Sequence, residues 1–379
     1  MNLKSEIKLS DLVRRSGGSK KAAASKSPGG EVVGLKIGAS QLAASRVANN
    51  GSAHLLQLAR GPLPSGIVVS GEVRDIPALA AALNEFFRLH RLPRRGVRLG
   101  VATNRIGVRS FELTGIDDEQ QLENAIRFRA HDALAIPVDE AVLDYHVVSE
   151  TLDDSGQTVR RVVLAAAYRD SIDRYVAACK QAGIEVVGVD LEAFALLRTV
   201  APAPAGDAPA AVVAVTIGHD RTTLAISDGA VCDFTRVLDW GGSSLDAVIE
   251  RELGVGAAQA AELKRALSLE TADTLGADAD DRRLDRAREA VRRELQSLAR
   301  DLVNSLQFYQ TQPGSLAISG ILLAGGTSRL NGLPEELERL THVRVWRADP
   351  LARVQVADSV GSREDLPSLA VAIGLGIEV

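Results

Sequence analysis

Apolar residues occur along this chain in two spacings, one typical of strands and one typical of helices. Residues 31–38, EVVGLKIG, form an almost continuous apolar run of the kind found in buried strands. Farther along, Leu79, Leu83 and Phe86 recur at the interval that places them on one face of a helix. Because runs of these two kinds alternate to the end of the chain, the pattern predicts an α/β fold.

Two stretches interrupt this alternation. Residues 16–30 are small, polar and rich in glycine, and residues 201–210, APAPAGDAPA, combine alanine with proline, so both are predicted to be linkers. The strand and turn after the second linker, AVVAVTIGHDRTTLAIS, repeat the order of the opening strand and turn. This repetition indicates two halves built around similar hairpins.

Charge is distributed unevenly between the first 30 residues and the rest. The first 30 carry seven lysines or arginines against two acids, so a tail of charge +5 precedes a body of charge −10. An acidic body does not resemble a domain that binds duplex nucleic acid, which would gather basic residues on a folded face. The apolar residues of the tail have partly helical spacing, and the sequence leaves open whether the tail is disordered or docks on a membrane or a partner.

Composition excludes several other kinds of protein. Aromatic residues make up only 3% of the 379 residues, which does not favour base stacking on single-stranded nucleic acid. Cys179 and Cys232 have no metal-like spacing, so neither a zinc site nor a disulfide framework is expected. No apolar run approaches the length needed to span a bilayer, and we expect a cytoplasmic protein without bound metal.

Three glycine-containing turns follow apolar runs that are predicted to be strands. Glycine after a buried strand lets backbone N–H groups approach an anion closely. A single turn of this type is most often only structural, but the order of two hairpin turns and then a glycine pair before a helix is more specific. The turns contain Gly38 and Ser40; Gly218, Arg221, Thr222 and Thr223; and Gly325, Gly326 and Thr327.

This order of turns, together with the amino-acid sequences of several segments, resembles the actin-like ATPase superfamily and, within it, the PilM proteins of type IV pilus assembly. The resemblance runs from about residue 32 to residue 377. The matching segments are VGLKIGAS, LPSGIVVSGEVRD, FELTGIDDEQQLENAIRFRAHDALAIPVDEAVLDYHVV, VTIGHDRTTLAI, AGGTSRLNGLPEEL and SLAVAIGLG. The third of these segments is the most specific to PilM proteins.

The resemblance implies an actin-like two-domain α/β fold with ribonuclease H-like halves. The first half is expected at 31–92 and 183–205, the second at 206–379, and a small α+β subdomain at 93–182 is inserted as in the division protein FtsA. ATP is expected in the cleft between the halves. The residues expected to contact it are Lys36, Gly38, Ser40, Thr216, Gly218, Arg221, Thr222, Glu262, Lys264, Gly325, Gly326 and Thr327.

The chain departs from the family pattern in both phosphate hairpins. Each hairpin usually begins Asp-Ile-Gly, but here the aspartates are replaced by Lys36 and Thr216. A carboxylate holds Mg²⁺ and orients an attacking water, whereas lysine repels the metal, so the loss of both acids predicts that hydrolysis is lost. Ala261 also stands where related proteins place a glutamate against the ribose. Lys36 could instead neutralise phosphate charge, and the sequence leaves open whether ATP is bound or the cleft is empty.

For the inserted subdomain, the resemblance implies a protein partner. In PilM proteins a groove involving this subdomain receives the short N-terminal peptide of PilN, an inner-membrane protein, which holds PilM at the inner face of the membrane with other pilus assembly proteins. We expect the groove at the edge of the helix EQQLENAIRFRAHDAL, with Leu122, Ile126, Arg127 and Arg129 as partner-binding residues. Self-association is left open.

Two other functions remain as alternatives to a catalytically inactive scaffold. A working ATPase would need acids that replace the missing pair, and Asp220, Asp228 and Asp239 are the candidates near the second hairpin. An FtsA-like filament former or a secretion scaffold is the other alternative. No arrangement of Ser, His and Asp or of Cys and His indicates nucleophilic catalysis.

Overall fold

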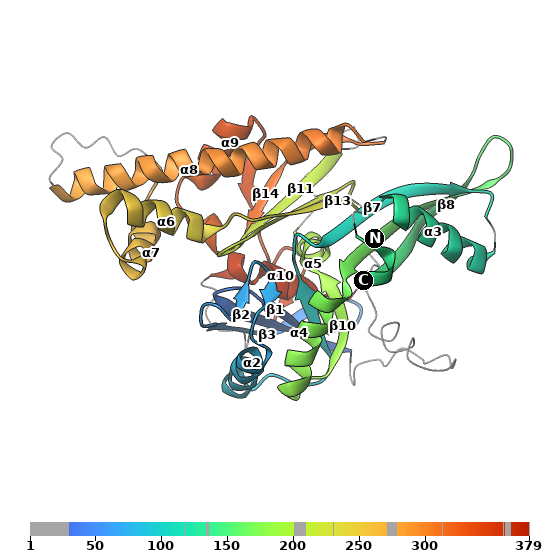
Figure 1. The fold of residues 1–379 in the computed structure, drawn as a ribbon, viewed down its shortest axis with the longest axis horizontal. Coiled ribbons are helices and arrows are strands. Elements are labelled where there is room, and N and C mark those ends of the chain that lie inside the picture. Colours follow the sequence, from blue (N-terminus) through green and yellow to red (C-terminus); the bar gives the residue numbers. More distant parts are fainter. Residues whose placement is uncertain are drawn as a thin grey trace.

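A computed structural model of the chain contains two larger halves and a smaller unit beside them (Figure 1). It describes residues 30–116, 118–133, 136–200, 210–229, 231–270, 279–312, 314–358, 360 and 365–378. Apart from Gly30, the predicted tail and first linker lie outside the described residues. The same holds for the predicted second linker apart from Ala210.

A six-stranded sheet forms the first half. Its elements are β1 (Glu31–Ile37), β2 (Gln41–Asn49), β3 (Ala53–Pro62), α2 (Ile76–His90), β6 (Val97–Val101), α4 (Arg169–Gln181), β10 (Val186–Leu191), α5 (Glu192–Thr199), β16 (Gln355–Val356) and α10 (Leu366–Gly376). The strand order is β10-β6-β1-β2-β3-β16, in which β1 is antiparallel to β2 and parallel to β6. The predicted helix face is confirmed, because Leu79, Leu83 and Phe86 of α2 are all buried in the core.

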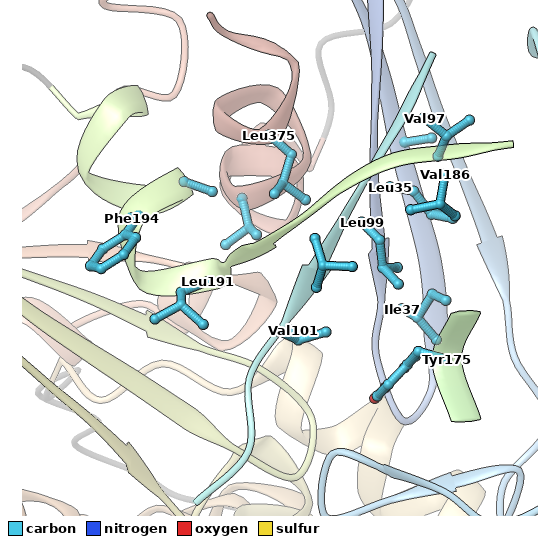
Figure 2. Packing of buried hydrophobic residues seen from close by; sticks show 14 of the residues in the cluster. Leu35, Ile37, Val97, Leu99, Val101, Tyr175, Val186, Leu191, Phe194 and Leu375 are labelled. Carbon is cyan, nitrogen blue, oxygen red and sulfur yellow. The ribbon is translucent and has the colours of Figure 1, made fainter. Parts of the chain in front are cut away.

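The two faces of β1 pack against different helices. Leu35 and Ile37 belong to the same core as Tyr175 of α4, and Figure 2 shows all three side chains together with Leu99 of β6. Gly34 lies against α10 on the opposite face, where an added Cβ would come within 2.2 Å of the Ala372 carbonyl oxygen. Helices therefore cover both faces of the sheet, as expected for a strand that is apolar almost throughout.

The second half repeats this plan with five strands. Its elements are β11 (Ala210–Ile217), β12 (Thr222–Ser227), β13 (Cys232–Leu238), α6 (Gly242–Leu253), α7 (Ala257–Ala266), α8 (Ala279–Gln310), β14 (Ala317–Ala324), η3 (Gly326–Arg329), α9 (Leu333–Thr341) and β15 (Val345–Arg347). The order β13-β12-β11-β14-β15 sets an antiparallel meander of β11, β12 and β13 beside the parallel strand β14. β1, β2, β3 and β6 have the same arrangement, as the repeated strand and turn predicted.

The inserted subdomain is shorter than the predicted segment 93–182. It consists of β7 (Ile106–Thr114), α3 (Glu119–Ala133), η2 (Val138–Glu140), β8 (Ala141–Leu152) and β9 (Thr158–Tyr168), with the antiparallel order β7-β9-β8. β6 and α4, which flank these elements in the chain, belong to the first half. Every residue of β6 is buried because it lies between β1 and β10, and α4 packs against α2.

The end of the chain also returns to the first half. β16 pairs with β3, and α10 packs against β1, β2 and α5. The predicted second half at 206–379 therefore contains two elements that complete the first half. α10 is nearly continuous in apolar residues, which suits a helix enclosed between the two halves.

The described residues include two cysteines. Both cysteines are buried free thiols. Burial raises the pKa of the Cys179 thiol to about 12 and also raises the pKa of the Cys232 thiol. Both thiols therefore stay protonated and unreactive near neutral pH. Among helices in the described ranges, none has the length and apolar character needed to cross a bilayer.

Candidate functional site

A cavity of about 770 Å³ lies between the two halves, and the three glycine turns meet there. The turns follow β1, β11 and β14. β11 and β14 are parallel neighbours, so their carboxyl ends open at the same edge of the sheet, which is where α/β folds place their ligands. Ten of the twelve residues expected to contact ATP line the cavity: Lys36, Gly38, Ser40, Thr216, Gly218, Arg221, Lys264, Gly325, Gly326 and Thr327.

The other two expected residues lie elsewhere. Thr222 is fully buried, and its hydroxyl donates to the Trp240 carbonyl oxygen at 2.8 Å, so it holds β12 against the end of β13. Its neighbour Thr223 points into the cavity because successive strand residues face opposite sides. Glu262 is exposed on α7 and is not among the lining residues, whereas Arg265 on the same helix is.

Lys36 forms an ion pair inside the cavity. Its Nζ atom lies 2.9 Å from Oε2 of Glu192, and the two side chains are only 15% and 7% exposed. Glu192 follows β10 as the first residue of α5 and lines the same cavity. The position that carries a metal-binding aspartate in the family pattern therefore carries a cation, and the nearest carboxylate is already neutralised by it.

Glu192 was not among the residues expected from the sequence. A signal for it exists, because a carboxylate directly after a buried strand that is parallel to β6 lies at the edge where the phosphate turns open. Thr216, at the end of β11, is buried and supplies a hydroxyl rather than a second acid. Within the described ranges, no three His, Cys, Asp or Glu side chains gather in a way that could hold a metal ion.

Lys264 is fixed in place and is not a freely solvated charge. Its Nζ atom donates to the Gly242 carbonyl oxygen and to Asp246 Oδ2, each at 2.7 Å. Thr327 Oγ1 donates to the Gly218 carbonyl oxygen at 3.1 Å, and the Gly242 amide donates to the same oxygen at 2.9 Å. These contacts join α6, α7 and the second and third turns into one wall of the cavity.

The second turn also reaches across to the first half. β4 (Val68–Val69) and β5 (Glu72–Val73) form a small hairpin whose Ser70 amide donates to Asp220 Oδ2 at 3.0 Å. Arg221 Nη2 lies 2.9 Å from Asp239 Oδ1, and Asn104 donates to Oδ2 of the same aspartate at 3.2 Å. Through Ser70 and Asn104, the first half therefore contacts two aspartates of the second half.

The three acids that could replace the missing pair have different positions. Asp220 is the only one of them that lines the cavity. Asp239 pairs with Arg221, and Asp228 pairs with Arg161 of the inserted subdomain at 3.1 Å. Asp228 therefore takes part in a contact between the second half and the inserted subdomain.

Arg161 connects the inserted subdomain to the second half. Besides Asp228, it pairs with Asp233 of β13, and both carboxylates are largely buried. Burial raises the pKa of Asp233, while the positive charge of Arg161 opposes that shift. Strand β7 also lies close to β13 (Figure 1), so the subdomain contacts the second half through a strand as well as through Arg161.

The helix expected to bind the partner, α3, has one buried and one exposed side. Leu122 and Ile126 are 4% and 2% exposed and belong to the core of the inserted subdomain, so neither presents a surface to a peptide. Arg127 is partly exposed and pairs with Glu123 at 3.1 Å, and Arg129 is exposed. Phe128 between them is 72% exposed, which was not expected from the sequence.

Comparison with known proteins agrees with this geometry. Residues 34–379 match the family described as type IV pilus assembly protein PilM. A solved PilM-PilN type IV pilus biogenesis complex has a TM-score of 0.74 at 26% identity, covering 92% of this chain and 98% of that one. The cell division protein FtsA of Pseudomonas aeruginosa is 26% identical over 392 residues, covering 93% of this chain and 90% of FtsA.

A more distant solved structure shares the fold alone. MreB5 of Spiroplasma citri bound to ADP has a TM-score of 0.52 at 13% identity, covering 91% of this chain and 94% of that one. Together these similarities confirm the predicted actin-like fold with its two halves.

Proposed function

Because this chain belongs to the PilM family of type IV pilus assembly proteins, we propose that it is an actin-like scaffold that docks the cytoplasmic N-terminal peptide of a PilN-type membrane protein. The observation that carries this proposal is the similarity along nearly the whole chain to a PilM-PilN complex. In this proposal the docked peptide holds the protein at the inner face of the membrane with the other pilus assembly proteins.

The docking surface proposed here is the exposed edge of α3. Arg127, Phe128 and Arg129 are consecutive residues outside the buried face of α3, and they offer two cations and an exposed aromatic ring in different directions around the helix. Aromatic and arginine side chains supply most of the binding energy at typical protein interfaces. The buried Leu122 and Ile126 contribute by holding α3 on its sheet.

The cleft is proposed to hold ATP as a structural ligand that is not turned over. Support comes from the glycine turns around the cavity, which offer backbone donors to phosphate groups, and from the lining cations Lys36, Lys264 and Arg265. The Lys36–Glu192 pair lies where a metal would be held in the family pattern. A bound magnesium ion would supply charge neutralisation and an oriented water. However, Lys36 and Thr216 replace the two hairpin aspartates that would hold it.

Docking is tested by titrating a fluorescently labelled N-terminal peptide of the cognate PilN-type protein with the full-length chain. The double substitution Arg127→Glu and Arg129→Glu should weaken binding at least about tenfold, since it removes two arginine side chains of the kind that supply much of the binding energy at interfaces. Fluorescence anisotropy at low ionic strength measures this effect.

Arg95 supplies the control for that titration. Its side chain is 82% exposed on the first half, so Arg95→Glu makes the same kind of charge reversal at one position away from α3. We expect this variant to bind the peptide as the wild type does. Wild-type affinity in the double variant would place docking elsewhere, and the absence of peptide binding by a folded wild-type protein would contradict the proposed function.

A further inference from the structure

We propose that the buried guanidinium of Arg221 forms a subsite for a phosphate oxyanion and that this subsite works without a divalent cation. The proposal deepens the proposed function, because it rests on a phosphate-bearing ligand entering the same cleft. It also concerns a position where the side chain, and not only the glycine-rich backbone, meets the ligand.

Arg221 lies between two cavities. Its side chain lines the cleft and also a second, polar cavity of about 580 Å³ that Ser70, Asn104 and Asp239 help to line. It extends from the turn before β12 across to the small hairpin of the first half. There a Cβ added to Gly71 would come within 3.3 Å of Arg221 Nε and within 2.3 Å of the Ala102 carbonyl oxygen. With its φ of +67°, Gly71 therefore leaves the room that the guanidinium occupies.

Most of the hydrogen-bonding capacity of this arginine is unused. Its side chain is only 8% exposed, and Nη2 is paired with Asp239. Among the described residues, neither Nε nor Nη1 has a hydrogen-bond partner. A guanidinium carries five donors and stays charged, so leaving two nitrogens buried and unpaired is costly. That cost is recovered when a ligand brings acceptors to them.

The surrounding charges favour an anion as that ligand. The acids that line the cleft near the phosphate turns are already engaged, since Glu192 pairs with Lys36 and Asp220 accepts from the Ser70 amide. Asp239 is 60% exposed, so its pairing with Arg221 is open to water and weak. A phosphate group offers several acceptors to a planar guanidinium and commonly binds it through two parallel hydrogen bonds.

The same chemistry has two sources, the terminal phosphate of a nucleotide and free inorganic phosphate. We therefore expect the full-length protein in EDTA to bind ATP at least about tenfold more tightly than AMP, because only ATP extends phosphates toward Arg221. Adding Mg²⁺ should change the ATP affinity by less than about threefold. Isothermal titration calorimetry with ATP, ADP, AMP and inorganic phosphate separates the two sources.

Substitution of the arginine gives the decisive comparison. Arg221→Gln should lower the preference for ATP over AMP at least about threefold while leaving AMP affinity within about threefold, and Arg221→Lys should lower it less, since it retains charge but not the paired donors. If inorganic phosphate alone binds and loses affinity in Arg221→Gln, the subsite takes the free anion. Arg95→Gln is the matched control and should change nothing.

Melting temperature and peptide docking are measured on every variant, and if Arg221→Gln does not fold, Arg221→Lys is compared with the wild type instead. An unchanged ATP preference in a folded Arg221 variant overturns the subsite, as does a wild-type protein that binds phosphate ligands only with Mg²⁺ or not at all. Because peptide docking is read separately, these outcomes leave the proposed docking function standing.

Discussion

Replacing Gly374 with valine is expected to prevent stable folding of the first half. An added Cβ at this position would lie 1.8 Å from the Ala195 carbonyl oxygen and 2.4 Å from Thr199 Oγ1. The first of these atoms is backbone, and the second is a hydroxyl held by hydrogen bonds. The Thr199 hydroxyl lies 2.9 and 2.8 Å from the carbonyl oxygens of Ala195 and Ala370 and shares its one proton between them, so it helps to join α5 to α10.

The expected loss in free energy of unfolding exceeds that of ordinary overpacking, which is about 1 to 3 kcal/mol, because the backbones of the two buried helices α5 and α10 must move apart. With a typical total stability of about 5 to 15 kcal/mol, such a loss leaves little folded protein. Thermal unfolding followed by circular dichroism measures it, with Gly374→Ala as the milder case. Gly256, where no atom of the described residues lies within 4 Å of an added Cβ, supplies the control Gly256→Ala. A Gly374→Val protein that melts with the wild type would contradict the observed packing of α10.

Replacing Lys36 with aspartate is expected to make ATP binding dependent on metal. The change removes a cation from the phosphate turn and adds a carboxylate near Glu192, which loses its partner at the same time. Two unit charges about 4 Å apart interact by about 4 kcal/mol at an effective dielectric constant of 20, so reversing one charge is a large perturbation even after partial screening.

We expect Lys36→Asp to lower ATP affinity in EDTA by about 100-fold and Mg²⁺ to restore most of it, because a divalent cation then bridges the carboxylates and the phosphates. Thr216 is unchanged, so phosphate release should stay absent. Calorimetric titration with and without Mg²⁺ measures both affinities, and Lys180→Asp on the exposed end of α4 is the charge-matched control. Equal ATP affinity of Lys36→Asp and wild type in EDTA would show that Lys36 does not face phosphate.

The general fold and the place of the site could be predicted from the sequence. Glycine after an apolar strand is a local signal, and the order of three such turns, together with the matching segments around them, carries the resemblance to the actin-like superfamily. Ten of the twelve residues that this resemblance implies for the cleft line the cavity. The boundaries of the inserted subdomain were harder, because β6 and α4 adjoin it in sequence while their partners, β1 and α2, lie far away along the chain.

What the sequence could not supply were pairings across the fold. The partner of Lys36 is Glu192, 156 positions later, and nothing local connects the two. Nor does the spacing of apolar residues on a helix show whether its apolar face meets a core or a partner, and Leu122 and Ile126, which were expected among the partner-binding residues, lie in a core. The unsatisfied guanidinium of Arg221 is a property of its surroundings, and only the packed structure reveals it.

One measurement tests most directly the claim that this chain is a PilM-family scaffold with a cleft that holds ATP without turning it over. The full-length protein is titrated with fluorescently labelled ATP with and without Mg²⁺, and phosphate release is followed in the same samples. We predict binding that is nearly independent of Mg²⁺ and no release above the protein-free rate. Binding that requires Mg²⁺, together with steady phosphate release, would contradict the account and show a working ATPase.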